Sequence, residues 1–156
     1  VDALARASGS RGMVGGQAMD LAAEGQTLDR VSLESIHIHK TGALIRAGVQ
    51  MATQALPGLD PQVAQRLDHY AKCLGLAFQI RDDILDVEGE TAVIGKTQGK
   101  DQDQNKATYP ALLGLAGAKE AAATLIDDAL ESLAGLDPQA SAPLRWLADY
   151  MVQRDH

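Results

Sequence analysis

The stretch from residue 61 to residue 86 constrains this chain more than any other, because apolar side chains recur in it at α-helical spacing. The recurring side chains are Val63, Leu67, Tyr70, Leu74, Ala77, Phe78 and Ile84. Asp60 followed by Pro61 is a typical helix start, with an N-cap residue and then proline at the first helical position. Gly89 lies just beyond the stretch, so we expect this long helix to end at about Asp86.

The rest of the chain also favours helices, and the sequence predicts an all-α fold. It contains 26 Ala and 20 Leu but only 8 Val and 7 Ile, and the first two residue types favour helix over strand. Further helices are expected over residues 1–8, 12–24, 32–56 and 110–133, the last interrupted at 114–117, and from residue 141 onward. Residues 90–107 are polar and lack an apolar period, so we expect a loop there.

Two serines are the expected N-caps of the predicted helices. Ser32 would begin the helix over 32–56, and Ser141 would begin the last helix, which has Pro143 in its first turn. In that last helix we expect four large side chains to face inward: Trp146, Leu147, Tyr150 and Met151.

Composition excludes several classes of function. With 156 residues the chain has the length of about one domain. A formal net charge of −7 and only 3% aromatic residues argue against nucleic-acid binding. The single cysteine, Cys73, allows no intramolecular disulfide and fits a reducing compartment. No apolar run is long enough to span a membrane and no signal peptide is visible, so we expect a cytoplasmic protein without membrane insertion.

Three aspartates near the end of the long predicted helix form the most informative pattern. Asp82, Asp83 and Asp86 fall with Gln79 within an arc of about 100° on one helix face. Carboxylates clustered near a helix C-terminus repel one another and oppose the helix dipole, so a positive charge should offset them. Hard oxygen ligands of this kind suit Mg²⁺, which often bridges one or two carboxylates to a substrate phosphate. The alternative is a solvated acidic face.

Lysines near this pattern supply the charge that a diphosphate would need. Lys40 and Thr41 lie within the predicted helix among apolar residues, where a lysine must reach solvent or an anion. Lys96, Lys100 and Lys106 lie in the predicted loop. The alternative for Lys40 is a lysine whose stem packs on apolar residues while its charge reaches solvent, and the alternative for the loop lysines is ordinary surface charge. His37 and His39 are two residues apart, which points them to different faces of a helix, so two histidines on the polar face are expected rather than a shared metal site.

Four motifs together resemble the trans-isoprenyl diphosphate synthase family, and most closely its bacterial farnesyl diphosphate synthases. The pattern Gly75-x-x-Phe78-Gln79-x-x-Asp82-Asp83-x-x-Asp86 is similar to the second aspartate-rich motif of that family. Three more segments match in order: Gly12-Met13-Val14-Gly15-Gly16-Gln17, His39-Lys40-Thr41-Gly42, and Gly95-Lys96 through Lys106-Ala107-Thr108-Tyr109-Pro110. The similarity covers essentially the whole chain.

The resemblance implies a helical bundle around a deep cavity and a Mg²⁺-dependent condensation of an allylic diphosphate with isopentenyl diphosphate. It implies that Asp82 binds a Mg²⁺ ion that bridges the allylic diphosphate, while Asp83 and Asp86 support the site through water or indirect contacts. By the same resemblance Lys40 and Lys96 would contact that diphosphate, and Lys106 would help to order a closing loop. Thr41 and Gln79 would direct oxygen dipoles at the carbocation that remains after the diphosphate departs.

One departure from the family pattern changes what this chain is expected to be. Nothing in it corresponds to the first aspartate-rich motif or to the isopentenyl diphosphate site of the family's N-terminal half. We therefore expect residues 1–156 to be the C-terminal portion of a single synthase domain, inactive alone and oligomeric or domain-exchanged through the apolar surface that the other half would cover. Product length and allylic substrate stay open.

Two alternatives remain at the level of sequence. The first is a non-catalytic helical subunit that pairs with an active synthase. The second is a terpene cyclase, against which the Phe78-Gln79 motif and the Lys40-Thr41 pair argue.

Overall fold

A computed structural model describes residues 1–94 and 107–153, and in these ranges every regular element is a helix, which confirms the all-α class. Side chains are described for residues 1–89 and 107–152. The elements are α1 (Asp2–Ser8), α2 (Met13–Ala22), α3 (Arg30–His37), the π-helix η1 (Ile38–Gly42), α4 (Ala43–Gln54), α5 (Pro61–Ile94), α6 (Tyr109–Ser132) and α7 (Pro138–Gln153). None of the described helices is both long and apolar enough to cross a membrane.

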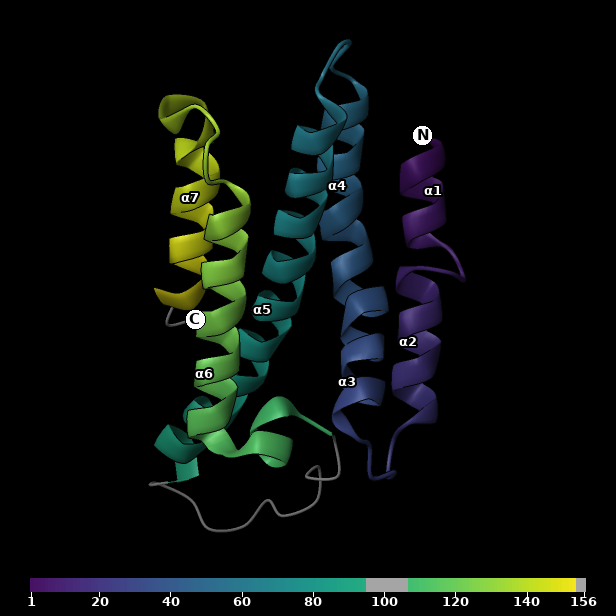
Figure 1. Ribbon diagram of the computed structural model, residues 1–156. Coiled ribbons are helices and arrows are strands. Elements are labelled where there is room, and N and C mark those ends of the chain that lie inside the picture. Colours follow the sequence, from purple (N-terminus) through teal and green to yellow (C-terminus); the bar gives the residue numbers. More distant parts are fainter. Residues whose placement is uncertain (95–106, 154–156) are drawn as a thin grey trace.

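The helices lie side by side, with the long α5 in the middle. Figure 1 shows α6 beside α5 on one side, with α7 outside it, and the rod formed by α3, η1 and α4 on the other. The short α1 and α2 lie along the far side of this rod, where α1 contacts α4 and α2 contacts η1. The middle of α5 is therefore covered on two sides, and the predicted aspartate motif lies in its second half.

Two hydrophobic clusters hold α5 in place. The first joins α5 to α6 and α7 and contains Tyr70, Cys73, Leu74, Ala77, Ile126, Ala129, Leu133, Ala148 and Met151. The Tyr70 hydroxyl donates a hydrogen bond of 2.9 Å to the carbonyl of Leu144, which satisfies the polar end of a fully buried ring. The second cluster joins α3, α5 and α6 through Leu33, Ile80, Ile84, Tyr109, Ala118 and Ala122. It lies directly beside the aspartate motif.

Several helices begin where the sequence predicts, and two begin elsewhere. The start at Pro61 is confirmed, with the Asp60 carboxylate accepting from the Gln62 amide at 2.8 Å. The first correction is that Asp29 is the N-cap of α3 and accepts from the amide of Ser32, the residue expected to be the cap. The second is that α7 begins at Pro138, three residues before Ser141, because the Asp137 side chain accepts from the amide of Ala140.

The interruption in α6 is confirmed at Gly114, whose φ of 73° lies in the left-handed region that favours glycine. The predicted end of the long helix is wrong, since α5 runs past Gly89 to Ile94, into the residues expected to form a loop. Within α7, Met151 is buried and Leu147 packs partly against the core, as expected. Trp146 and Tyr150 are instead 64% and 45% exposed and stack on each other.

Candidate active site

A π-helical turn interrupts the helix that was expected to run unbroken over residues 32–56. It comprises Ile38–Gly42, and it contains the His39-Lys40-Thr41-Gly42 motif. A π turn has wider hydrogen-bond spacing than an α-helix and is often found at functional sites. Here it sets the direction of Lys40 and Thr41 relative to the helices on either side.

Two glycines bring neighbouring helices against this π turn. A Cβ atom built on Gly16 of α2 would lie 2.2 Å from the backbone nitrogen of Lys40. A Cβ atom built on Gly75 of α5 would lie 3.0 Å from the Cα atom of Gly42. Only residues without a side chain permit these approaches, so the small residues of two predicted motifs serve to pack backbones closely around the third.

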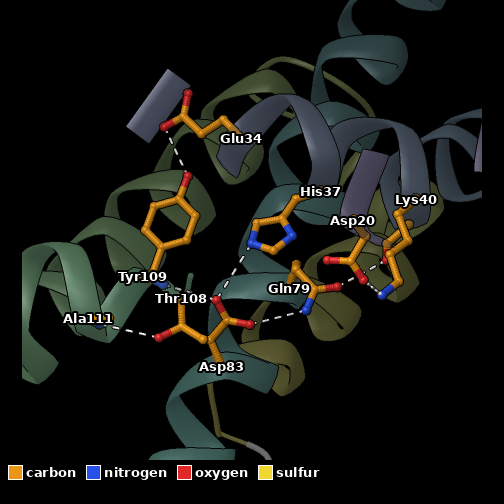
Figure 2. Close-up of polar contacts among 10 residues, drawn as sticks. Asp20, Glu34, His37, Lys40, Gln79, Asp83, Thr108, Tyr109 and Ala111 are labelled. Carbon is orange, nitrogen blue, oxygen red and sulfur yellow. Dashed lines mark hydrogen bonds and ion pairs between the residues drawn. The ribbon is translucent and has the colours of Figure 1, made fainter. Parts of the chain in front are cut away.

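Lys40 forms a partly buried ion pair across this contact. Its Nζ atom lies 2.5 Å from a carboxylate oxygen of Asp20 on α2, and the side chains are 29% and 19% exposed. Figure 2 shows the two side chains directed toward each other. The pairing explains how a lysine is accommodated among apolar neighbours.

A chain of hydrogen bonds joins the π turn to the aspartate motif. The Thr41 hydroxyl donates to Gln79 Oε1 at 3.0 Å, and Gln79 Nε2 donates to Asp83 Oδ1 at 3.2 Å. Thr41 and Gln79 are 38 positions apart in the sequence. The structure thus brings together two residues that the sequence analysis assigned to the same step.

Asp83 is a buried carboxylate, only 6% exposed, at the centre of this arrangement. Its second oxygen, Oδ2, accepts a hydrogen bond of 3.1 Å from the backbone amide of Tyr109, at the start of α6 (Figure 2). The ring atom Nε2 of His37 lies 3.5 Å from the same oxygen. Asp83 therefore connects α3, α5 and α6 at one point.

His37 is not on a polar face, which corrects the expectation from spacing. It is 6% exposed and stacks on the Tyr109 ring at 5.8 Å between centroids. Among the described residues neither ring nitrogen has a hydrogen-bond partner. The ring is buried because it lies between Tyr109 and the Asp83 carboxylate, where α3, α5 and α6 meet.

Tyr109 is a functional candidate that the sequence analysis mentioned only as part of a motif. Its hydroxyl donates to Glu34 Oε1 at 2.9 Å, and burial, with Glu34 adding to it, raises the pKa of Tyr109. The side chain of Thr108 caps α6 by accepting from the amide of Ala111 at 3.3 Å (Figure 2). The spacing of Glu34, His37 and Thr41, at i, i+3 and i+7, was the signal that could have indicated polar side chains on the inward side of one helix.

The other predicted site residues divide into two groups. Asp82 is half-buried and Asp86 exposed, one turn further along α5. Lys96 and Lys106 lie outside the described residues.

The acidic residues fit Mg²⁺ in one of its common binding modes. Asp82 and Asp86 offer hard carboxylate oxygens from adjacent turns, which suits an ion that keeps several waters and is shared with a substrate phosphate. Within the described part of the chain no group of three or more His, Cys, Asp or Glu side chains is placed to hold a metal ion. A site built from one or two carboxylates and a bound diphosphate does not need such a group.

Comparison with solved structures identifies the class of protein. The fold matches an FPP/GFPP synthase from Zymomonas mobilis with a TM-score of 0.80 and 39% identity, over 96% of this chain and 49% of that one. It also matches a geranyltransferase from Helicobacter pylori, solved with magnesium and isoprenyl diphosphate, with a TM-score of 0.76 and 30% identity, over 97% and 49% of the two chains. The helical bundle is thus of the isoprenoid synthase type.

The sequence places the chain within a family. The polyprenyl synthetase model matches residues 3–141, and the chain belongs to this family. The farnesyl diphosphate synthase of Escherichia coli is 52% identical over an alignment of 157 positions that covers 99% of this chain and 52% of the relative. The chain spans about half the length of the curated relatives it matches.

Proposed function

We propose that the protein acts in a prenyltransferase that condenses an allylic diphosphate with isopentenyl diphosphate to give a short-chain product such as farnesyl diphosphate. The observation that carries the proposal is the hydrogen bond of 3.0 Å between Thr41 and Gln79. It joins the Lys-Thr motif of the π turn to the aspartate-rich helix. Family membership and the fold support the same reaction.

The polar residues have distinct roles in this proposal. Lys40 and Lys96 contact the allylic diphosphate and Lys106 assists them, while Thr41 and Gln79 direct oxygen atoms at the carbocation formed when the carbon–oxygen bond breaks. Apolar walls would keep water from that cation. Asp82 would hold Mg²⁺, and Asp83 and Asp86 would support the site through water or indirect contacts. The bound ion neutralises charge that develops on the departing diphosphate.

We further propose that residues 1–156 form the C-terminal portion of one synthase domain and that the remaining helices are needed for turnover. The match to about half of each relative supports this division. Closely packed copies of the same half would bury apolar side chains such as Val14, Leu21 and Val31, which are more than half exposed, so an oligomer is expected. A cytoplasmic location fits these substrates.

The test uses the chain itself and a chimera. In the chimera, this chain replaces the aligned segment of the Escherichia coli farnesyl diphosphate synthase, and product formation from geranyl and isopentenyl diphosphates is measured with and without Mg²⁺. We expect product only from the chimera and only with Mg²⁺. A correctly folded chimera that makes no product contradicts the prenyltransferase proposal, and turnover by the 156-residue chain alone contradicts the division of the domain.

Single substitutions in the chimera assign the roles. Lys40→Ala and Asp82→Ala should each lower kcat by about a hundredfold or more, because each removes charge stabilisation of the transition state. The matched controls are Lys119→Ala, an exposed lysine paired with Glu88, and Asp127→Ala, an exposed aspartate on α6. Both controls should leave kcat unchanged. Equal effects in the test and control variants would refute the assigned roles.

A further inference from the structure

The amide of Gln79 has two chemically different ends, and the structure indicates what decides which end faces Thr41. An amide side chain can present either its oxygen or its NH₂ group to a neighbour, and the two orientations have nearly the same shape. In one orientation an oxygen faces Thr41, and in the other two hydrogens do. A group that stabilises a carbocation must offer oxygen, so the choice matters for the proposed reaction.

Asp83 determines this choice because an ionised carboxylate only accepts hydrogen bonds. Its Oδ2 atom is occupied by the Tyr109 amide, whose position is fixed by the start of α6. Its Oδ1 atom lies 3.2 Å from Gln79 Nε2. If the amide were reversed, two oxygens would face each other at about this distance inside a buried site, which is strongly unfavourable.

The orientation of the Gln79 amide in turn determines the hydrogen bond of Thr41. With Gln79 Nε2 held by Asp83, Gln79 Oε1 accepts the hydroxyl proton of Thr41 at 3.0 Å. The Thr41 hydroxyl proton is then used in the hydrogen bond to Gln79. The lone pairs of Thr41 Oγ1 and Gln79 Oε1 that remain can face a cation.

We propose that Asp83 is a positioning residue that orients the Gln79 amide so that the Thr41–Gln79 pair presents oxygen atoms to the substrate cation. The inference rests on the proposed function and goes beyond it, because it gives Asp83 a task on the protein side of the site in addition to its indirect support of the metal. The Tyr109 amide holds the carboxylate from the α6 side, and the His37 ring lies 3.5 Å from it on the α3 side. The burial of Asp83 to 6% exposure fits a residue that acts through another side chain.

The test exchanges the hydrogen-bond donor and acceptor between positions 79 and 83. In Asp83→Asn the single side-chain oxygen stays with the Tyr109 amide, so its NH₂ group faces residue 79 and reverses the Gln79 amide. We expect kcat of the chimera to fall about ten- to a hundredfold while KM for both diphosphates changes little. In the double variant Gln79→Glu with Asp83→Asn, the carboxylate introduced at position 79 accepts hydrogen bonds from the amide introduced at position 83 and from the Thr41 hydroxyl. The summed formal charge of positions 79 and 83 is unchanged. We expect kcat to recover at least tenfold over Asp83→Asn.

A matched control lies outside the site. Gln50 Nε2 donates to Asp68 Oδ1 at 3.1 Å, which is the same pairing of amide and carboxylate on α4 and α5. Asp68→Asn should leave kcat unchanged. If the double variant is as slow as Asp83→Asn, or if saturating Mg²⁺ alone restores the kcat of Asp83→Asn, the positioning role is refuted.

A second measurement separates this inference from the proposed function. Urea unfolding of the 156-residue chain needs no activity, and the midpoint concentration should fall in Gln79→Glu and in Asp83→Asn but recover in the double variant. Recovery of the midpoint together with an inactive chimera would contradict the proposed function and support the orientation of Gln79 by Asp83. An active chimera whose double variant recovers neither stability nor kcat would refute the inference alone.

Discussion

Gly16 packs against the backbone of Lys40 so closely that a Cβ atom at position 16 would lie 2.2 Å from the Lys40 nitrogen. The other atoms nearest to that position also belong to the backbone of the π turn, which cannot move aside as a flexible side chain could. Gly16→Ala should therefore lower the free energy of unfolding by about 1–3 kcal/mol, measured by urea denaturation. It should also shift the π turn and so reduce activity.

Gly48 supplies the control for this substitution. It lies within α4, and a Cβ atom there would have no neighbour within 4 Å. Gly48→Ala should raise stability by about 0.5–1 kcal/mol, because alanine is the better helix former. If both alanine variants are equally stable, the close contact between α2 and the π turn is not present in solution.

Tyr70 should make the protein less stable at high pH. Burial raises the pKa of Tyr70 to about 12 from its ordinary value of 10.0. Between these two values the unfolded chain loses the phenol proton while the folded chain keeps it, so stability is unaffected below pH 10 and falls as the pH rises toward 12. Tyr70→Phe should be less stable at pH 7 by about 1 kcal/mol, since it loses the bond to the Leu144 carbonyl.

The decisive measurement for Tyr70 is the slope of unfolding free energy against pH between 10 and 12. It should be shallower in Tyr70→Phe than in the unsubstituted chain, with the remaining slope coming from Tyr109, whose pKa is also raised. Parallel slopes would show that Tyr70 ionises as easily in the folded state as in the unfolded one.

Asp68 should contribute stability that is lost in acid. Burial acts to raise the pKa of Asp68, but hydrogen bonds from Arg46, Lys72 and Gln50 outweigh it and lower the pKa to about 2. The contribution is present above pH 3.8, the ordinary value, and disappears as the pH falls toward 2. Because Asp68 and its partners are partly exposed to solvent, we expect these interactions to add about 1 kcal/mol to the free energy of unfolding at pH 6.

Unfolding of the unsubstituted chain and of Asp68→Asn, compared at several pH values between 2 and 6, tests this contribution. The difference in free energy should be largest at pH 6 and close to zero at pH 2. A difference that is independent of pH would mean that the charge of Asp68 has no part in it.

Asp20 should compete with an anion for Lys40, since the two side chains lie 2.5 Å apart. Asp20→Asn keeps the size of the side chain but removes its charge, and so should strengthen binding of inorganic pyrophosphate by up to about fivefold, corresponding to roughly 1 kcal/mol. Isothermal titration calorimetry on the chimera would measure the change. In a Lys40→Ala background the Asp20 substitution should have no such effect, and an equal gain there would show that Lys40 is not the residue responsible.

Local patterns predicted much of the fold because helix caps and apolar spacing act over a few residues. They placed the start of α5 at Pro61 and the break at Gly114. They were wrong where two capping residues lie close together, as with Asp29 and Ser32, because both are suitable and only the surrounding packing chooses. Trp146 was placed inward on hydrophobicity alone, whereas the structure leaves it exposed and stacked on Tyr150.

The arrangement of the site depends more on tertiary contacts than on the spacing of residues along the sequence. The resemblance to a family suggested roles for Thr41 and Gln79, but no pattern along the chain could show that they touch. The burial of His37 and the bond from the Tyr109 amide to Asp83 both arise where α3, α5 and α6 meet. Periodicity also could not reveal the π turn, because helix continues on both sides of it.

The π turn between α3 and α4 has a consequence for how this chain can change in length. A π turn holds one residue more than an α turn, so removing one residue from Ile38–Gly42 would leave a continuous helical rod. The five residues of the π turn advance the helix through about the same rotation as four residues of an α-helix, so α3 and α4 would keep nearly the same relative orientation. Glu34 and His37 would stay beside Tyr109 and Asp83, whereas the side chains of the turn itself, Lys40 and Thr41 among them, would be displaced. A one-residue deletion here should thus spare the fold and damage the site.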